Sequence, residues 1–378
     1  MADRYLAGRG RARGAAVMAR PQSGAPIPAL DADQDAVARG QPAFSILCSA
    51  YRCEAYLADT IDSVVGQTLA DWELIIVDNG PSDAIAAIVD RYRDDPRIRL
   101  IRQQNSGLIG GMATAVDAST GQYLVPLDSD DMLTPAFCRR MAEVLDSRSE
   151  IDVLSCDARV FRDGEEHDLA NSFLRKRLGL EHRLTLADMI GEHDVIPYFA
   201  VFRRDAWLAA GGYAPGTDLV EDIALYLRLI VSGHDVRVLP ERLTRYRLRG
   251  DSASRDPSGV EAFESACERV YSGAALESGD PAILSVLAER IRGFRYEQAL
   301  RRARWAFVNG DVAGARRASR AAFSQRRTMR GAVVLVGVSV APGALRVIRP
   351  LKHRVSRGAS RVVARVAALA DRHTVRER

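Results

Sequence analysis

The sequence predicts an α/β protein in which a mostly parallel sheet carries helices on both faces and is followed by a C-terminal helical extension. Short apolar runs alternate with helical patterns between residues 44 and 131, which is typical of successive βαβ units. Each apolar run is followed by polar residues. From about residue 285 onward, helical patterns and arginines dominate. With 378 residues, 47% of them hydrophobic, the chain can bury a substantial core.

Four strands and three helices are expected in order along the first part of the chain. The strands are short apolar runs, whereas the first helix carries Leu57, Ile61, Val64 and Val65 on one face. Ser82 is the predicted N-cap of the second helix. The expected strands are residues 44–50, 72–77, 98–101 and 123–127, and the expected helices are residues 54–67, 82–93 and 110–118.

We expect four segments along the chain. Residues 1–41 are rich in Gly, Ala, Arg and Pro without apolar periodicity, which predicts a disordered leader rather than a signal peptide. Residues 42–256 would form the α/β domain, and residues 257–330 a helical domain with an αα-hairpin. Residues 331–378 would form a basic amphipathic tail. Nothing reaches the roughly 18 to 20 consecutive apolar residues that span a bilayer.

Charge is distributed unevenly along the chain. From Ser285 onward there are 22 Lys and Arg against 5 Asp and Glu, although the net charge of the whole chain is +4. The run 332–340 and the Arg-rich segment after it would suit a helix at an anionic membrane surface, with a basic solvated helix as the alternative. Nucleic acid is not an expected partner, because aromatic residues are not interleaved with these arginines. The five cysteines are expected to be reduced core residues of a cytoplasmic protein.

The run Leu127–Asp131 is the most informative stretch, because it places three carboxylates directly after an apolar segment. Like charges this close repel each other unless a cation lies among them, and Mg²⁺, Mn²⁺ and Ca²⁺ all take carboxylate oxygens as ligands. The alternative is an acidic turn that caps the following helix, with Thr134 as N-cap and Pro135 at the first helical position.

Polar residues also follow the other three predicted strands. They are Tyr51 and Arg52, then Asp78-Asn79-Gly80, then Asn105-Ser106-Gly107. Asn, Asp and Gly are favoured in ordinary turns as well. The carboxyl ends of parallel strands nevertheless meet at one edge of the sheet, where ligands bind in such folds. Four polar loops at that edge therefore predict a ligand site.

These motifs, in this order, resemble those of family 2 glycosyltransferases of the GT-A fold. The resemblance covers about residues 44–254 and continues through Gly211-Gly212-Tyr213, Glu221-Asp222 and Tyr246-Arg247. It implies an inverting, metal-dependent enzyme that moves a sugar from a nucleotide-diphosphate donor of UDP, GDP or dTDP type. The implied acceptor is a hydroxyl of a polysaccharide, glycolipid or lipid-linked glycan. The implied location is the cytoplasm, peripheral at the inner face of the membrane if the tail binds lipid.

The resemblance also implies roles for individual residues. Asp130 would be the leading ligand of Mn²⁺ or Mg²⁺, with Asp128 at the metal or the sugar, while Asp131 would support either residue or cap the next helix. An acceptor hydroxyl needs a carboxylate as general base, and Asp222 is the expected base with Glu221 as its neighbour. First-turn acids that simply favour the helix dipole are the alternative. The expected donor-binding residues are Ala50, Tyr51, Glu54, Asp78, Asn105, Gly107, Asp128, Arg247 and Arg249.

Two departures from the family pattern affect these expectations. Gly111-Met112-Ala113 stands where the family often carries Ala-Arg-Asn, so a basic contact is missing. Arg249 stands where a histidine is common. Arginine cannot ligate a metal but can bind phosphate, so we expect fewer protein ligands on the metal and Arg249 or Arg247 on the diphosphate. His193 is expected to be a surface residue and Trp207 a packing residue.

Two rival functions are compatible with parts of the pattern. One is a degenerate glycosyltransferase-fold scaffold that binds a partner through its basic tail. The other, less favoured, is a nucleotidyltransferase that makes the sugar nucleotide. The second rival predicts a Gly-rich basic loop directly after the first strand, and residues 49–52 do not form one.

Overall fold

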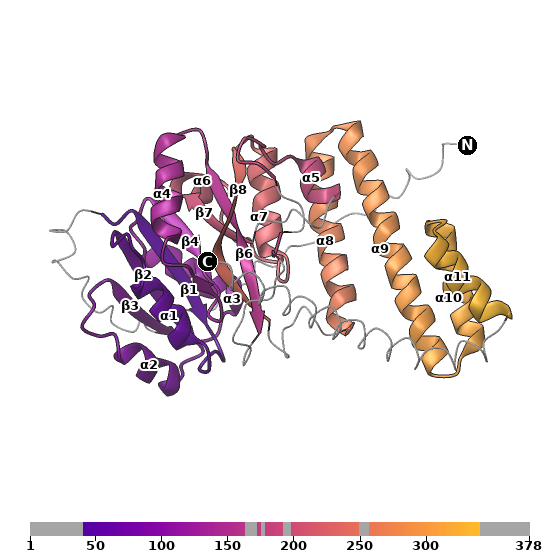
Figure 1. Cartoon of the computed structure of the whole chain (residues 1–378), viewed down its shortest axis with the longest axis horizontal. Coiled ribbons are helices and arrows are strands. Elements are labelled where there is room, and N and C mark those ends of the chain that lie inside the picture. The colour runs from indigo at the N-terminus through magenta and orange to yellow at the C-terminus, as the bar shows by residue number, and fades with distance from the viewer. Residues whose placement is uncertain (1–40, 163–171, 175–177, 192–197, 249–256, 341–378) are drawn as a thin grey trace, which may run out of the picture. The chain divides into compact units, whose positions relative to one another are not determined.

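A computed structural model describes residues 41–162, 172–174, 178–191, 198–248 and 257–340. Its elements are shown in Figure 1. In chain order they are β1 (Phe44–Ala50), α1 (Leu57–Val65), β2 (Trp72–Asn79), α2 (Asp83–Asp90), β3 (Ile98–Gln103), α3 (Gly107–Ala118), β4 (Tyr123–Pro126), β5 (Met132–Leu133), α4 (Phe137–Ser147), β6 (Val153–Arg162), α5 (Leu186–Gly191), β7 (Phe199–Arg203), α6 (Arg204–Ala209), α7 (Glu221–Val231), β8 (Val236–Leu248), α8 (Pro257–Ser278), α9 (Pro281–Val308), α10 (Val312–Gln325) and α11 (Met329–Val340).

The eight strands form one sheet in the order β3-β2-β1-β4-β7-β6-β8-β5. Strands β1 to β4 pair in parallel, as the alternating pattern predicts. Strand β7 runs antiparallel to both β4 and β6, and β5 runs antiparallel to β8. Because β6 and β8 are parallel to each other, only β5 and β7 run against the common direction. The predicted mostly parallel α/β sheet is therefore confirmed.

Alternate residues of each central strand point to opposite faces of the sheet, as the strand period of two requires. Phe44 and Ile46 of β1 pack in the cluster that includes α1, α2 and α4. Leu47 packs in the other cluster, which includes α3, α6 and α7. Both faces are covered, so the central strands are mostly apolar on both faces instead of alternating strictly with polar residues.

The helix boundaries differ from the predicted ones by a few residues. Ser82 caps α2 as predicted, because its Oγ accepts a hydrogen bond from the Ile85 backbone N (3.3 Å). The helix after the acidic run begins at Phe137 with Ala136 as its N-cap. The alternative in which Thr134 and Pro135 begin this helix is therefore wrong, and the acidic run does not cap it.

Helices α8 and α9 pack against the same core as the α/β domain, whereas α10 and α11 pack on α9 in two smaller clusters. Tyr271 of α8 and Phe294 of α9 belong to the cluster that contains α7. Helices α9 and α10 pack against each other, and Asp311 caps α10 by accepting from the Gly314 backbone N (2.7 Å). All five cysteines are buried free thiols, as predicted. The predicted leader and the part of the tail beyond residue 340 lie outside the described residues.

None of the described helices is both long enough and apolar enough to cross a bilayer.

Candidate active site

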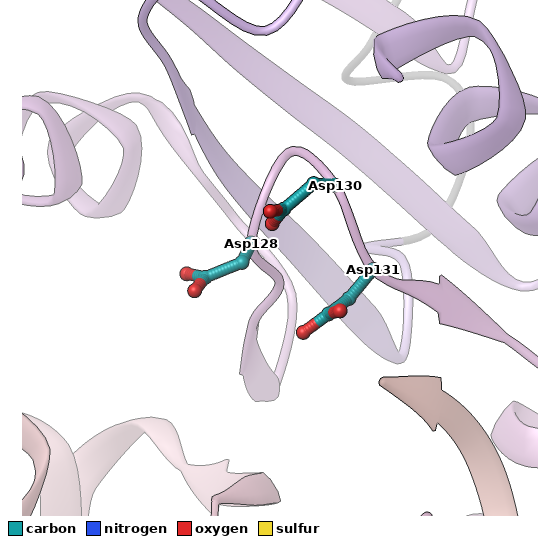
Figure 2. Close-up of side chains that lie close together, drawn as sticks. All are labelled: Asp128, Asp130 and Asp131. Atoms are coloured by element: carbon teal, nitrogen blue, oxygen red, sulfur yellow. The ribbon is translucent and has the colours of Figure 1, made fainter. Parts of the chain in front are cut away.

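The acidic run forms a tight loop at the carboxyl end of β4. The Asp131 backbone N donates to the Asp128 carbonyl (3.2 Å), which closes the loop. The carboxylates of Asp128, Asp130 and Asp131 each offer an oxygen within 4.8 Å of the others. Figure 2 shows all three turned toward the same side of the loop. The predicted convergence of these carboxylates is therefore present.

Asp131 is the most buried member of this acidic loop. Its Oδ1 accepts from the Arg247 backbone N (2.8 Å), whereas its Oδ2 is buried without a hydrogen-bond partner. Burial and the nearby Asp128 charge raise the pKa of Asp131 well above its ordinary value. A divalent cation relieves this kind of electrostatic conflict, and carboxylate oxygens are the ligands that Mg²⁺ and Mn²⁺ accept. The residues present therefore fit a hard divalent cation.

Arg247 of strand β8 contacts the acidic loop. Its Nε donates to the Asp130 carbonyl (2.8 Å), and its Nη2 pairs with Asp59 of α1 (2.9 Å). The guanidinium carbon lies 4.9 Å from the centre of the Tyr56 ring. The predicted contact of Arg247 with a diphosphate stays a prediction, and Arg249 lies outside the described residues.

Asp78 lies buried at the end of β2. Its Oδ2 accepts from the Ser82 backbone N (2.8 Å) and from Arg102 Nε (3.1 Å), while its Oδ1 is buried without a partner. Arg102 also pairs with Asp83 (3.0 Å). One oxygen of Asp78 is thus fixed by the protein, and the other is left as an acceptor.

Asn79 ties the loop after β2 to the loop after β3. Its Oδ1 accepts from the Ser106 backbone N and from Gln103 Nε2, both at 3.0 Å, and its Nδ2 donates to the Gly107 carbonyl (2.7 Å). Sequence analysis placed Asn79 in the ligand-facing loop but gave it no role of its own. Asparagine is too common in turns for the sequence to reveal this contact.

Tyr51 lies beside the Asp78 loop. A Cβ on Gly80 would come within 3.0 Å of the Tyr51 ring, and Gly80 has φ +137°, so glycine is needed there to admit the ring. Tyr51 remains 46% exposed. Glu54 accepts from the Ser82 hydroxyl (3.1 Å). Tyr51, Glu54 and Asp78 are therefore brought together.

Two other predicted donor-binding residues line the same edge of the sheet. Ala50 ends β1 in register with Asp78. Asn105 is exposed, and its Oδ1 accepts from the Gly107 backbone N (2.9 Å). Together with the Asn79 contact, this bond fixes Gly107 at the start of α3.

The missing basic residue in α3 has a packing explanation. A Cβ on Gly111 would lie 2.1 Å from Ser49 Oγ, so α3 approaches β1 more closely than a larger residue allows. The next residue, Met112, is buried in the core. Positive charge at Asp78 comes instead from Arg102 of β3, which sequence analysis did not single out.

Glu221 and Asp222 form the first turn of α7. Burial raises the pKa of Asp222 to about 6, against the hydrogen bond that it accepts from the Ile223 backbone N (2.7 Å). Burial and the Asp222 charge raise the pKa of Glu221 to about 7. The Asp128 charge contributes to both shifts, so this turn lies near the acidic loop. The site thus contains a carboxyl group that titrates near neutral pH.

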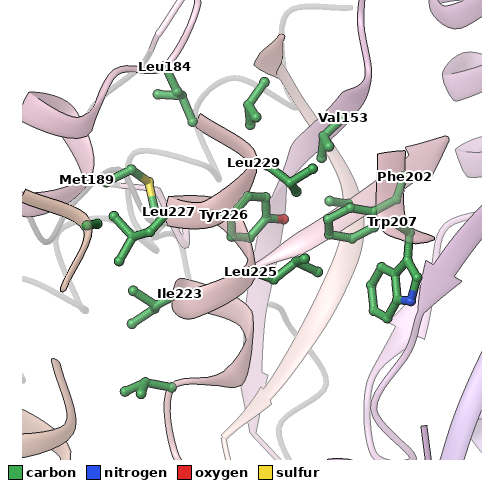
Figure 3. Packing of buried hydrophobic residues seen from close by; sticks show 14 of the residues in the cluster. Val153, Leu184, Met189, Phe202, Trp207, Ile223, Leu225, Tyr226, Leu227 and Leu229 are labelled. Atoms are coloured by element: carbon green, nitrogen blue, oxygen red, sulfur yellow. The ribbon is translucent and has the colours of Figure 1, made fainter. Parts of the chain in front are cut away.

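Helix α7 is held in place by apolar contacts on two sides. Figure 3 shows Leu225 and Leu229 directed toward the sheet residue Phe202, and Leu227 toward Met189 of α5. The helix ends at Val231, and Gly233, two residues later, has φ +86°, a left-handed conformation that glycine readily adopts after a helix. This packing positions the first turn.

Tyr198 contacts the acidic loop and was missed by sequence analysis. Its hydroxyl donates a short hydrogen bond to Asp128 Oδ2. Its ring packs against Phe173 (5.7 Å), Phe199 (4.7 Å) and Tyr246 (5.5 Å). Burial and the Asp128 charge raise the pKa of Tyr198 well above its ordinary value, so it is a neutral donor. No motif in residues 159–197 pointed to this cluster.

The two remaining sequence expectations have different outcomes. Trp207 is buried and packs edge-on against Phe202 (ring centres 5.0 Å apart), so the packing interpretation is confirmed. His193 lies outside the described residues.

Comparison with known sequences identifies relatives over the first part of the chain. Residues 45–208 match the family model described as Glycosyl transferase family 2. The hyaluronan synthase of Pasteurella multocida is 29% identical over 225 residues, which are 58% of this chain and 22% of that protein. The chondroitin synthase of Escherichia coli is 30% identical, over 52% of this chain and 28% of that protein. The chain thus spans about a quarter of the length of these relatives.

A shorter relative and two solved structures match over larger shares of their length. A putative teichuronic acid biosynthesis glycosyltransferase of Bacillus subtilis is 27% identical, over 57% of this chain and 82% of that protein. S. aureus TarS 1–349 in complex with UDP-GlcNAc superposes with a TM-score of 0.55 at 18% identity, over 78% of this chain and 88% of that one. The mannosyltransferase PcManGT of Pyrobaculum calidifontis, in complex with GDP-Man and Mn²⁺, gives 0.51 at 15% identity, over 86% of each chain. These two likenesses show a shared fold.

Proposed function

Because this chain belongs to glycosyltransferase family 2 through its domain of residues 45–208, we propose that it transfers a sugar from a nucleotide-diphosphate donor to an acceptor hydroxyl, with inversion and with a divalent cation. One observation carries the proposal. The acidic loop and the Asp78 loop follow the carboxyl ends of the parallel strands β4 and β2, the first turn of α7 is close enough to the acidic loop for the Asp128 charge to act on both of its carboxyl groups, and each of the three supplies a group that this reaction needs.

The donor nucleotide would bind at Asp78 and Tyr51. The buried Asp78 Oδ1, which has no protein partner, can accept an N–H of the base or a hydroxyl of the ribose. The exposed Tyr51 ring offers a face on which a base can stack. TarS and PcManGT, which share the fold, were solved with UDP-GlcNAc and with GDP-Man, which supports a UDP, GDP or dTDP sugar here.

Asp130 and Asp128 would hold Mn²⁺ or Mg²⁺, with Asp131 behind them. The cation, when bound, neutralises the departing diphosphate and so replaces a proton donor. Arg247 fixes the loop through the Asp130 carbonyl, and Tyr198 orients Asp128. The chain's own residues therefore define the shape of the cation site.

Asp222 would take the proton of the acceptor hydroxyl. A base with a pKa of about 6 is deprotonated at neutral pH and still basic enough to accept a proton as the new bond forms. Attack from the face opposite the leaving group inverts the anomeric centre, by the geometry that also governs inverting glycosidases.

The acceptor would be a glycan or a lipid-linked glycan. The printed names of the relatives include hyaluronan, chondroitin and teichuronic acid. The half-buried rings of Phe173, Tyr198 and Tyr246 beside Asp128 support a sugar acceptor, because sugar rings pack on aromatic faces through their C–H groups.

A ligand screen followed by a transfer assay tests this function. We expect one class of sugar nucleotide to raise the melting temperature in the presence of Mn²⁺ and to be consumed when glycan acceptors are added. The Asp130→Asn variant should lose the Mn²⁺-dependent part of the shift. If no sugar nucleotide shifts the melting temperature or turns over, the scaffold alternative is favoured.

We further propose that α11 and the residues after it attach the protein to an anionic membrane. Four residues at helical spacing form an exposed stripe on α11, with exposures of 58–82%: Met329, Val333, Val336 and Val340. The stripe lies opposite Gly331 and Val338, which pack inward. Residues 341–378 carry 10 Lys and Arg against 2 Asp and Glu. An apolar face beside a basic segment is typical of peripheral attachment to anionic lipid.

Vesicle co-sedimentation of the full chain tests this attachment. We expect binding to phosphatidylcholine vesicles that contain phosphatidylglycerol and weak binding to phosphatidylcholine alone. The double variant Val333→Asp, Val336→Asp should lose most of the binding. Leu276→Asp is the matched control, because Leu276 is 69% exposed on α8, outside the stripe. Equal binding by the two variants would contradict the attachment.

A further inference from the structure

A cavity lies between α5 and the helical extension, away from the acidic loop. Its volume is about 350 Å³, and it is lined by Gly191 at the end of α5 and by Ser285, Val286, Glu289, Arg290 and Arg326. Helices α5 and α9 pack against each other at this place (Figure 1). The volume is within the range of small-molecule sites.

Arg290 brings a guanidinium group to this cavity without a protein acceptor for much of it. Its Nε and Nη2 are buried and have no hydrogen-bond partner in the part of the chain that the structure describes. The guanidinium carbon lies 4.7 Å from the centre of the Phe294 ring. Burial lowers the pKa of Arg290 from its ordinary value, although arginine remains charged. A buried cation without an acceptor is costly, and an anionic ligand would remove that cost.

Arg326 reaches the same cavity from the end of α10. Its Nη2 donates to the Glu289 carbonyl (3.2 Å) and to the Glu289 carboxylate (2.5 Å), while its Nε is buried without a partner. The guanidinium lies over Gly293, where a Cβ would come within 3.1 Å of Nη2. A glycine in the middle of a long helix costs about 1 kcal/mol relative to alanine. A larger residue at position 293 would crowd Arg326, so glycine there leaves space for the guanidinium group.

The local charges do not balance. Glu289 is shared between Arg326 and Arg292, whose Nη2 lies 2.6 Å from it. Arg290 itself has no ion pair within the described residues, and Glu264, the carboxylate whose charge acts on it, is already paired with Arg301 (2.5 Å). A phosphate group carries close to two negative charges near neutral pH and matches the fork of donors on arginine.

We propose that this cavity binds a phosphate-bearing small molecule through Arg290 and Arg326, with Ser285 as a further donor. The ligand would bridge α5 and α9, and so would stabilise the packing of the helical extension on the α/β domain. No lining residue belongs to the acidic loop or to the Asp78 loop. The proposal does not depend on the proposed transferase function.

Calorimetric titration of the full chain, in buffer with EDTA and without metal, tests the proposal with orthophosphate and with glucose 1-phosphate as probes. We expect binding and a rise in melting temperature for the unmodified chain. Arg290→Gln should weaken binding by at least about tenfold, because it removes a charge-assisted pair of hydrogen bonds. Arg304→Gln is the charge-matched control, since Arg304 is exposed and makes no ion pair within the described residues; its affinity should stay within about twofold of the unmodified chain.

Further variants separate this cavity from the nucleotide site and from loss of folding. Arg326→Gln should weaken binding in the same way as Arg290→Gln, with circular dichroism to confirm that both fold. Asp130→Asn should bind both probes normally. Equal affinity for the two probes identifies the phosphate group as the whole ligand, and tighter binding of glucose 1-phosphate identifies a phosphorylated sugar. Absence of binding by the unmodified chain at about 10 mM probe, unchanged binding by both arginine variants, or loss of binding in Asp130→Asn would overturn the proposal.

Discussion

The two sides of the candidate active site differ in whether their buried carboxylates have an ion pair. On the proposed donor side, Asp78 is buried with Arg102 and the Ser82 amide on one oxygen. On the proposed acceptor side, neither Glu221 nor Asp222 has an ion pair in the part of the chain that the structure describes, and burial raises the pKa of both. A carboxylate with an ion pair is held in place as a hydrogen-bond acceptor. Burial of a carboxyl group without an ion pair instead raises its pKa toward neutral pH. The first suits ligand binding and the second suits proton transfer.

Asp222→Asn breaks the acceptor side of this comparison and should have the largest effect. Loss of a general base costs roughly 10²–10⁴-fold in rate, and we expect about 10³-fold in kcat with little change in donor KM. Initial rates of sugar transfer measure both quantities. Glu221→Gln is the matched control, because it removes the neighbouring carboxyl group from the same turn. If Glu221→Gln loses the larger share of activity, the two residues exchange roles.

Asp130→Asn tests the acidic loop that lies between the two sides. Asp128 and Asp131 would remain to hold the cation more weakly, so we expect a loss of about 10²-fold at low Mn²⁺ that higher Mn²⁺ partly restores. Transfer rates over a series of Mn²⁺ concentrations measure this.

Asp117→Asn is the matched control for Asp130→Asn, since Asp117 is an exposed carboxylate on α3. It should show unchanged metal dependence. A loss in Asp130→Asn that no Mn²⁺ concentration reduces would contradict a ligand role for Asp130.

The strands of the donor side could be predicted from sequence, and those of the acceptor side could not. Strands β1 to β4 are short apolar runs separated by helical patterns, which is a regular signal. Strand β8 carries four arginines and Pro240 within its 13 residues, so its sequence does not look like a buried strand. The β6–β8 pairing also shifts register at Asp157. Such a strand exists because of its tertiary partners, which a local pattern does not contain.

The same limit applies to single residues of the site. The carboxylates were predictable because few structural roles place three of them after a strand. The contacts of Asn79, Arg102 and Tyr198 depend on loops that are distant in sequence. Arg247 was assigned to a diphosphate from its place in the motif, and only the fold brings it against Asp130 and Asp59.

The pH dependence of transfer sharpens the comparison, because burial raises the pKa of both Glu221 and Asp222. Asp222 must be deprotonated to act as a base, so kcat/KM should rise with pH up to about 6, by about tenfold per pH unit below that value, and then level off. Profiles of kcat/KM report the groups of the free enzyme. The rising limb should persist in Glu221→Gln and disappear in the residual activity of Asp222→Asn. A limb that persists in Asp222→Asn would assign it to another group.

Arg102→Met tests the ion pair between Arg102 and Asp78 and should have the smallest effect on transfer. It leaves the buried Asp78 without its ion pair, so the carboxyl group loses both its charge balance and its orientation. Because Arg102 is 39% exposed, solvent screening limits the loss, and we expect about a fivefold increase in donor KM with kcat unchanged.

Arg99→Met is the matched control: Arg99 lies on the same strand and pairs with Glu73 of β2 (2.7 Å), away from the ligand-binding edge. Both variants should have a somewhat lower free energy of unfolding by chemical denaturation, and only Arg102→Met should raise donor KM. Equal donor KM values in the two variants would mean that Asp78 is a structural residue and that compensation of its charge has no part in donor binding.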